Sequence, residues 1–244
     1  MSEARFASPS VAPIATLVRG AFEHVLRARL FALAAHGGAV TGYIAGFSDF
    51  DFVVFTHGAL TVDDTLAIQR VTRDLDASPF GYLQLSRAVD VDDPAERREG
   101  LIDDAYVLFH GTLPDDWSFH SAQTLRKRGQ EAIDRVPREI VRLSHDWAMA
   151  NVAARSRLIR YLTTVLKPAV RALLCELGEP VLDVWRSPYG ELVARLNRYD
   201  AELASDLRSF VELLPALDTS EDTAAGAAFS LLSSVHARSL GVRT

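Results

Sequence analysis

Cysteine and lysine are scarce in this chain, and long apolar runs are missing. Cys175 is the only cysteine among 244 residues, which excludes an intrachain disulfide and a zinc site built from several cysteines. No apolar stretch approaches the roughly 20 residues that span a bilayer. The first residues lack a basic start followed by an apolar run, so we expect no signal peptide. These absences predict a cytoplasmic protein with no membrane segment.

Positive charge is also in short supply, since 26 lysines and arginines face 32 aspartates and glutamates, for a net charge of −6. General binders of nucleic acid or of anionic membranes need a net basic surface. Aromatic residues do not alternate with the basic ones, so stacking of single-stranded bases has no support. The composition therefore argues against a nucleic-acid partner, and the sequence leaves the oligomeric state open.

The hydrophobic pattern changes character near residue 112. Before it, apolar spacing predicts helices at 11–27, 61–77 and 92–105 and strands at 30–37, 49–55, 80–89 and 106–111. After it, only helical spacing remains, at 120–150, 151–177, 187–214 and 222–240, with breaks at Pro137, 177–180, 187–190 and 214–220. The prediction is an α+β fold, with a small mixed-sheet domain at 1–114 and an all-α helical bundle at 115–244.

Two acidic residues stand at the start of a predicted buried strand, in the sequence Asp49-Phe50-Asp51-Phe52. A separation of two residues places both carboxylates on one face of the strand, about 6–7 Å apart at the backbone. Charges that close repel unless a proton, a basic side chain or a divalent cation intervenes. Mg²⁺ prefers oxygen ligands and often takes one or two carboxylates, with substrate phosphates completing its shell. Asp49 and Asp51 are thus candidate metal ligands.

A Gly-Gly pair, Gly37 and Gly38, ends the preceding strand and opens a segment that could be a short helix. Without Cβ atoms this backbone can approach a phosphate closely, and the amides of a helix start suit an anion. A phosphate cradle next to a metal-binding strand is what phosphoryl or nucleotidyl transfer requires.

This pattern resembles the signature of the DNA polymerase β-like nucleotidyltransferase superfamily. Gly37 and Gly38 are followed by ten residues and then by Asp49-Phe50-Asp51-Phe52, with Ser48 directly before the first aspartate. The order of elements, with a helical domain behind, is similar to the aminoglycoside-nucleotidyltransferase branch. The resemblance implies that Asp49 and Asp51 are catalytic and hold Mg²⁺, and that Gly37, Gly38 and Ser48 contact the nucleotide.

Two positions depart from that signature, and the first is His36, which stands where an apolar residue usually precedes the first glycine. Members of the superfamily usually carry a third acidic residue on the later strand, and the matching position here holds Gln84. Glutamine can coordinate a cation through its carbonyl oxygen, but it cannot take a proton from an attacking hydroxyl. The base could come from the helical domain, for example from Glu139 or Asp146. Otherwise the site is a two-carboxylate version or is impaired.

The predicted helix at 151–177 places four basic residues near one face, namely Arg157, Arg160, Lys167 and Arg171. Such a face can simply be solvated, as on many amphipathic helices. The alternative is that it neutralises a triphosphate, for which Lys167 is the candidate beside Pro168.

These features predict an enzyme that moves a nucleoside monophosphate from an NTP, with ATP as the first expectation, to a hydroxyl of a small-molecule acceptor. The resemblance makes an aminoglycoside-like acceptor the first expectation. Two alternatives stay open: a catalytically impaired nucleotide-binding or regulatory protein of the same fold, and a nucleotidyltransferase that modifies a protein.

Overall fold

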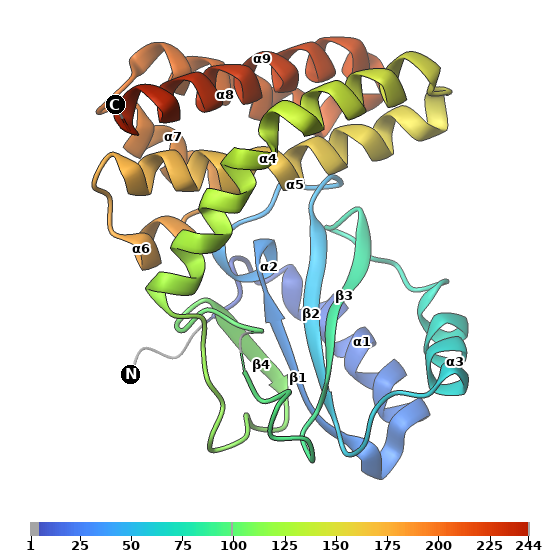
Figure 1. Ribbon diagram of the computed structural model, residues 1–244. Coiled ribbons are helices and arrows are strands. Elements are labelled where there is room, and N and C mark those ends of the chain that lie inside the picture. Colours follow the sequence, from blue (N-terminus) through green and yellow to red (C-terminus); the bar gives the residue numbers. More distant parts are fainter. Residues whose placement is uncertain (1–4, 99, 244) are drawn as a thin grey trace. The chain divides into compact units, whose positions relative to one another are not determined.

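A computed structural model describes residues 5–98 and 100–243 of the chain. The chain divides into two compact units, Met1–His120 and Ser121–Thr244. The first is an α+β unit and the second is helical, which confirms the predicted fold class (Figure 1). The predicted domain limits at residues 114 and 115 stay a prediction.

The first unit holds a four-stranded mixed sheet in the order β3-β2-β1-β4. Its strands are β1 (Leu30–His36), β2 (Asp49–Thr56), β3 (Tyr82–Asp90) and β4 (Tyr106–His110). β1 is antiparallel to β2 and to β4, whereas β2 and β3 are parallel. Parallel neighbours need a crossover connection, which here contains α3 (Val62–Thr72). This topology brings the end of β1 and the starts of β2 and β3 to one edge of the sheet.

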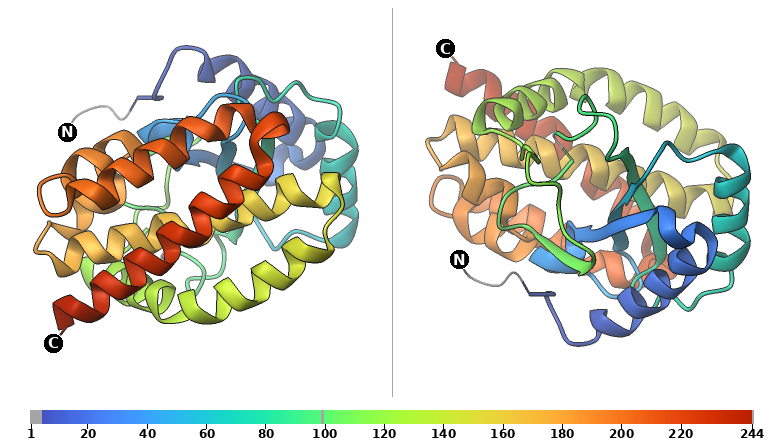
Figure 2. Two further views of the ribbon diagram at one scale, coloured as in Figure 1. Left: turned by 90° about the horizontal axis from the view of Figure 1, so that it is seen from above. Right: turned by 90° about the horizontal axis from the view of Figure 1, so that it is seen from below.

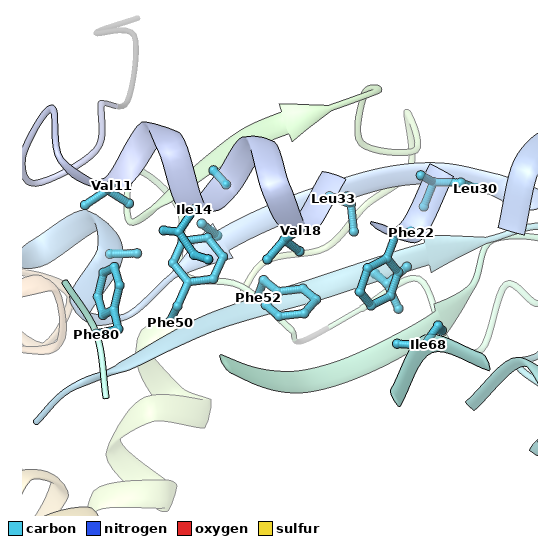
Figure 3. Packing of buried hydrophobic residues seen from close by; sticks show 14 of the residues in the cluster. Val11, Ile14, Val18, Phe22, Leu30, Leu33, Phe50, Phe52, Ile68 and Phe80 are labelled. Atoms are coloured by element: carbon cyan, nitrogen blue, oxygen red, sulfur yellow. The ribbon is translucent and has the colours of Figure 1, made fainter. Parts of the chain in front are cut away.

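Both faces of the sheet are covered by apolar side chains. On one face, α1 (Val11–Leu26) packs Ile14, Val18 and Phe22 against Phe50 and Phe52 of β2 (Figure 3). The ring centroids of Phe22 and Phe52 are 5.4 Å apart in an edge-on contact. Burying aromatic rings on this scale contributes about 1.5–3 kcal/mol per side chain.

The other face of β2 buries Val53 and Phe55, with Trp117 packed edge-on against Phe55. Because side chains alternate along a strand, Asp49 and Asp51 lie on this same face, beyond the end of its apolar cluster. The two aspartates therefore lie at the start of β2, next to the apolar cluster that buries the rest of this face of the strand.

The predicted helix at 92–105 is wrong, since the described residues of that segment form turns and irregular backbone. Arginine side chains bind backbone carbonyl oxygens that would accept hydrogen bonds within a helix. Arg87 donates to the carbonyl oxygens of Glu96 and Arg98, and Arg97 donates to that of Val91. Leu101 is buried in the cluster around Trp117, so the segment packs as a covering loop. The predicted helix 61–77 is also shorter than expected and ends at Thr72.

The second unit is made of helices. They are α4 (Ala122–Met149), α5 (Val152–Glu176), α6 (Val181–Arg186), α7 (Tyr189–Leu196), α8 (Ala201–Leu213) and α9 (Leu217–Arg243), with a 3-10 turn at Leu214–Ala216. The first unit also contains the short helix α2 (Gly38–Thr41) and a 3-10 turn at Arg27–Arg29. α5 packs against both α4 and α9 (Figure 2). None of the helices in the described ranges combines the length and the apolar character that crossing a membrane requires.

Three expectations for these helices need correction. Pro137 does not break its helix, because α4 continues through it with Ile133 and Val136 fully buried. This burial outweighs the roughly 3 kcal/mol that an interior proline costs. The predicted helix 187–214 is two helices, since Asp200 caps α8 by accepting from the backbone N–H of Leu203 at 3.0 Å. α6 was not predicted, because its six residues are too few to show periodicity.

A buried ion-pair network ties the start of α6 to the end of α7. Glu179 accepts from Arg195 Nη1 at 2.7 Å, from Arg198 Nη2 at 2.6 Å and from the Tyr199 hydroxyl at 2.9 Å. Burial by itself raises the pKa of Glu179, but the hydrogen bonds from Tyr199 and Arg195 and the charge of Arg198 outweigh it and leave the pKa below its usual value. Removing one member of such a network leaves the others without their partner.

Glu179→Gln is therefore expected to lower the free energy of unfolding by about 2–3 kcal/mol at neutral pH, measured by urea denaturation. Because folding depresses the pKa of Glu179, its contribution is complete above the ordinary glutamate pKa and is lost as the pH falls below that value. The matched control is Glu191→Gln, since Glu191 binds Arg195 from an exposed position and its loss should cost under about 1 kcal/mol. Equal effects of the two substitutions would contradict the assignment.

Candidate active site

The turn after β1 adopts a backbone conformation that favours glycine. Gly37 has φ +59° and ψ −134°, and α2 starts at the next residue. The carbonyl oxygen of Gly37 accepts from the backbone N–H of Thr41 at 2.9 Å and from its hydroxyl at 3.0 Å. The turn is thereby fixed by the helix that follows it.

The carboxylate of Asp51 lies directly against this turn. A Cβ atom placed on Gly37 would be 2.8 Å from Asp51 Oδ2, closer than real Cβ contacts. Glycine is thus required at residue 37 both by the φ angle and by the space that Asp51 fills. The structure brings together the two halves of the predicted site, the glycine turn and the acidic strand.

Ser48 and Gly38 also belong to this edge of the sheet. The Ser48 hydroxyl accepts from the backbone N–H of Ile44 at 2.8 Å, which closes the loop between α2 and β2. A Cβ on Gly38 would lie 3.7 Å from Ser48 Cβ and 3.3 Å from Tyr43 Cβ. Four predicted site residues, Gly37, Gly38, Ser48 and Asp51, therefore lie close to one another, and Asp49 precedes Asp51 on the same strand face.

Gln84 is the partner of Asp51 in the parallel ladder, and Tyr82 is the partner of Asp49. Paired residues of neighbouring strands share a face, so Gln84 lies beside the aspartates as the sequence predicts. The Tyr82 hydroxyl donates to Gln84 Oε1 at 3.4 Å.

Ser86 is a residue of this site that sequence reasoning missed. Its hydroxyl donates to Asp51 Oδ1 at 3.2 Å. Ser86 lies at a register shift between β2 and β3, after which Val53 pairs with Arg87. The two oxygens of Asp51 thus have different contacts: Oδ1 accepts from Ser86, and Oδ2 lies against Gly37. No local sequence signal announces a bulge of this kind.

The donor set suits a magnesium ion. Two carboxylates on one strand face, with a hydroxyl and an amide carbonyl beside them, are the oxygen ligands that Mg²⁺ accepts when phosphates fill its remaining positions. In the described part of the chain, no group of three or more histidine, cysteine, aspartate or glutamate residues is placed to hold a metal ion. The site thus offers a two-carboxylate arrangement that needs substrate oxygens to complete it.

The other predicted residues lie in the helical unit. Lys167 is on α5, with Nζ 5.0 Å from the centroid of the Tyr189 ring, and its predicted contact with a nucleotide stays a prediction. Glu139 and Asp146, the candidate alternative bases on α4, accept hydrogen bonds from Arg142 at 2.7 Å and 3.0 Å respectively. Both carboxylates therefore bind the same guanidinium.

Sequence comparisons find no family model that matches this chain and no match among curated proteins. Five chains of solved structures do match. One is the crystal structure of spectinomycin adenyltransferase AAD(9) from Enterococcus faecialis with ATP and spectinomycin. It shares 12% sequence identity with this chain and superposes with a TM-score of 0.55, over 94% of this chain and 98% of its own. At that identity the likeness shows a common fold.

Proposed function

We propose that the chain is a magnesium-dependent nucleotidyltransferase that moves a nucleoside monophosphate from ATP to a hydroxyl of a small aminoglycoside-like molecule. The observation that carries the proposal is the placement of Asp51 Oδ2 against the Gly37 turn. This placement lets one substrate contact the carboxylates and the backbone amides together. The fold shared with a protein named as an adenyltransferase, solved with ATP and spectinomycin, supports the same reaction class.

In this reaction the acceptor hydroxyl gives up its proton, its oxygen forms a bond to the α-phosphorus, the bond from that phosphorus to the bridging oxygen breaks, and pyrophosphate leaves. A bound Mg²⁺ would neutralise phosphate charge and align the phosphates. Asp49 and Asp51 would hold it, with Ser86 fixing the orientation of the Asp51 carboxylate. Gly37 and Gly38 would present backbone N–H groups to the phosphates that leave.

A second candidate function is favoured by one observation, the presence of Gln84 next to Asp51 in the ladder. An amide cannot accept the proton of the attacking hydroxyl. A chain with this site could bind nucleotide and act as a regulator with little turnover.

Two measurements separate the candidates. Calorimetric titration with ATP and Mg²⁺ should show binding under both, whereas pyrophosphate release against a panel of aminoglycosides should appear only for the transferase. An absence of ATP binding in the presence of Mg²⁺ would contradict both.

The substitution Gln84→Glu tests whether the lack of a proton acceptor at residue 84 limits the rate of the reaction. A glutamate at this position adds a proton acceptor beside Asp51 and keeps the shape of the side chain. General base catalysis contributes about 10²–10⁴-fold, so we expect acceptor-dependent pyrophosphate release to rise by at least about tenfold. The matched control is Gln69→Glu on exposed α3, which adds the same charge away from the site and should change nothing. A fall in rate in Gln84→Glu would show that the amide itself is required.

A further inference from the structure

A small cavity lies inside the helical unit, where the first turns of α4, the last turns of α5 and α6 meet (Figure 1). Its volume is about 140 Å³. Gly129 of α4 and Ala172 of α5 both line it, and a Cβ on Gly129 would be only 2.9 Å from Ala172 Cβ. Leu125, Cys175 and Trp185 also line it. Because Leu125, Ala172 and Trp185 are buried, the inner wall of this cavity is largely apolar.

Trp185 brings a hydrogen-bond donor to this cavity. The residue is 4% exposed, and its Nε1 has no hydrogen-bond partner among the described residues. Trp185 Cζ2 is 3.7 Å from the position that a Cβ on Gly129 would take. Nε1 and Cζ2 are both bonded to Cε2, so they share one edge of the indole. The edge that carries the N–H therefore faces the side of the cavity on which Gly129 lies.

The charged groups over the Trp185 ring cannot supply the acceptor that this N–H needs. Arg128 and Arg171 have Cζ atoms 5.6 Å and 5.2 Å from the centroid of the ring. A guanidinium group carries donors only, and it lies over the ring, whereas the N–H points outward in the plane of the ring. Buried indole N–H groups usually have an acceptor. A molecule that enters the cavity can provide one.

Cys175 shows that the wall of this cavity disfavours charge. Burial raises the pKa of its thiol to about 11, although the positive charges of Arg126 and Arg171 act in the opposite direction. The thiol is therefore uncharged at neutral pH. An ionised group of a ligand would meet the same poorly hydrated wall and would lose its own hydration there. A neutral ligand suits the cavity better than an anion or a cation.

We propose that this cavity binds a neutral single-ring molecule that carries a hydrogen-bond acceptor, with the acceptor facing the N–H of Trp185. An engineered cavity of about 150 Å³ takes up benzene, so a volume of this size matches one six-membered ring. The ring would contact Leu125, Ala172 and the thiol of Cys175. The site belongs to the helical unit alone and needs neither a metal ion nor the aspartates of β2, so it goes beyond the proposed transferase reaction.

The test uses acetophenone and α-methylstyrene, which have nearly the same shape and differ in that a methylene group replaces the carbonyl oxygen. Each is titrated into the isotope-labelled full chain without metal or nucleotide, and the N–H resonances are followed by NMR. The indole resonance of Trp185 is the one that disappears in Trp185→Phe. We expect acetophenone to move this resonance downfield with a saturable dependence on concentration, whereas α-methylstyrene should give no downfield shift.

The backbone amide of Gly129 reports binding in the wild type and in Trp185→Phe alike. Trp185→Phe should weaken the binding of acetophenone by at least about fivefold and change that of α-methylstyrene by less than about twofold, since only acetophenone accepts from the N–H. Trp147→Phe is the matched control, because Trp147 lies on α4 and is not among the residues that line the cavity. It should leave both affinities unchanged.

If Trp185→Phe fails to fold, Cys175→Met takes its place, since the longer side chain would fill the cavity and should abolish binding of both probes. Wild-type affinity in Cys175→Met would overturn the proposal. The absence of a saturable shift in the wild type would assign the cavity to water alone and would also overturn it. Equal weakening of the two probes in Trp185→Phe would show an apolar cavity in which the N–H has no part. Because no titration contains metal or nucleotide, these outcomes are independent of whether the proposed transferase reaction occurs.

Discussion

Asp51→Asn is expected to reduce pyrophosphate release by about 10³-fold or more, because the amide removes the negative charge that a metal ion requires. The substitution keeps the size of the side chain, and its remaining carbonyl oxygen can still accept from Ser86. Folding should therefore be preserved, with a thermal midpoint close to that of the wild type. The measurement is the steady-state rate of pyrophosphate release at saturating ATP and Mg²⁺.

The matched control is Asp74→Asn, which removes the same charge from an exposed residue that pairs with its neighbour Arg73. We expect its rate to stay within about twofold of the wild type, since exposed pairs contribute little. A second measurement follows ATP binding as Mg²⁺ is varied, where Asp51→Asn should require far more of the ion. Unchanged rate and unchanged metal dependence would remove Asp51 from the site.

The parts of this site that the sequence predicts are those governed by local rules. Alternation along a strand places Asp49 and Asp51 on one face whatever the rest of the chain does, and the buried pattern of β2 follows from its phenylalanines and valines. The position of Gln84 also follows from alternation, once the strands are known to be parallel neighbours. Gly37 could be identified by another local rule, because two glycines at the end of a strand predict a turn.

The parts that the sequence does not predict depend on contacts between distant residues. Ser86 contacts Asp51 because β3 lies in register beside β2, and the periodicity of a single strand does not give the register of its neighbour. The segment 92–105 has helical spacing, yet Arg87 from a neighbouring strand captures its carbonyls. Arg171 on α5 lies against α6, with Cζ 5.2 Å from the centroid of the Trp185 ring, and helical periodicity alone does not predict this packing of a basic residue.

Gly37→Ala is expected to lower the rate of pyrophosphate release by about 10²-fold while the chain still folds. The new methyl group would lie 2.8 Å from Asp51 Oδ2, so the carboxylate or the turn must move. A displacement of about 1 Å at a catalytic group commonly costs this factor. The φ angle of +59° adds a strain of about 1–2 kcal/mol, which appears as a lower free energy of unfolding.

Gly58→Ala separates the two effects of that substitution. Gly58 has φ +73°, and a Cβ there would meet nothing within 4 Å, so alanine introduces the backbone strain without the clash. Gly58→Ala should therefore lose the stability that the strain alone costs, and Gly37→Ala at least as much in urea denaturation, whereas only Gly37→Ala should lose activity and bind ATP more weakly at a given Mg²⁺ concentration. If both lose activity equally, the loss comes from general destabilisation, and the contact between the glycine turn and Asp51 has no part in the reaction. If Gly37→Ala loses stability but keeps its rate, the Asp51 carboxylate does not need its observed position. The site proposed from the Gly37 turn and Asp51 is then wrong.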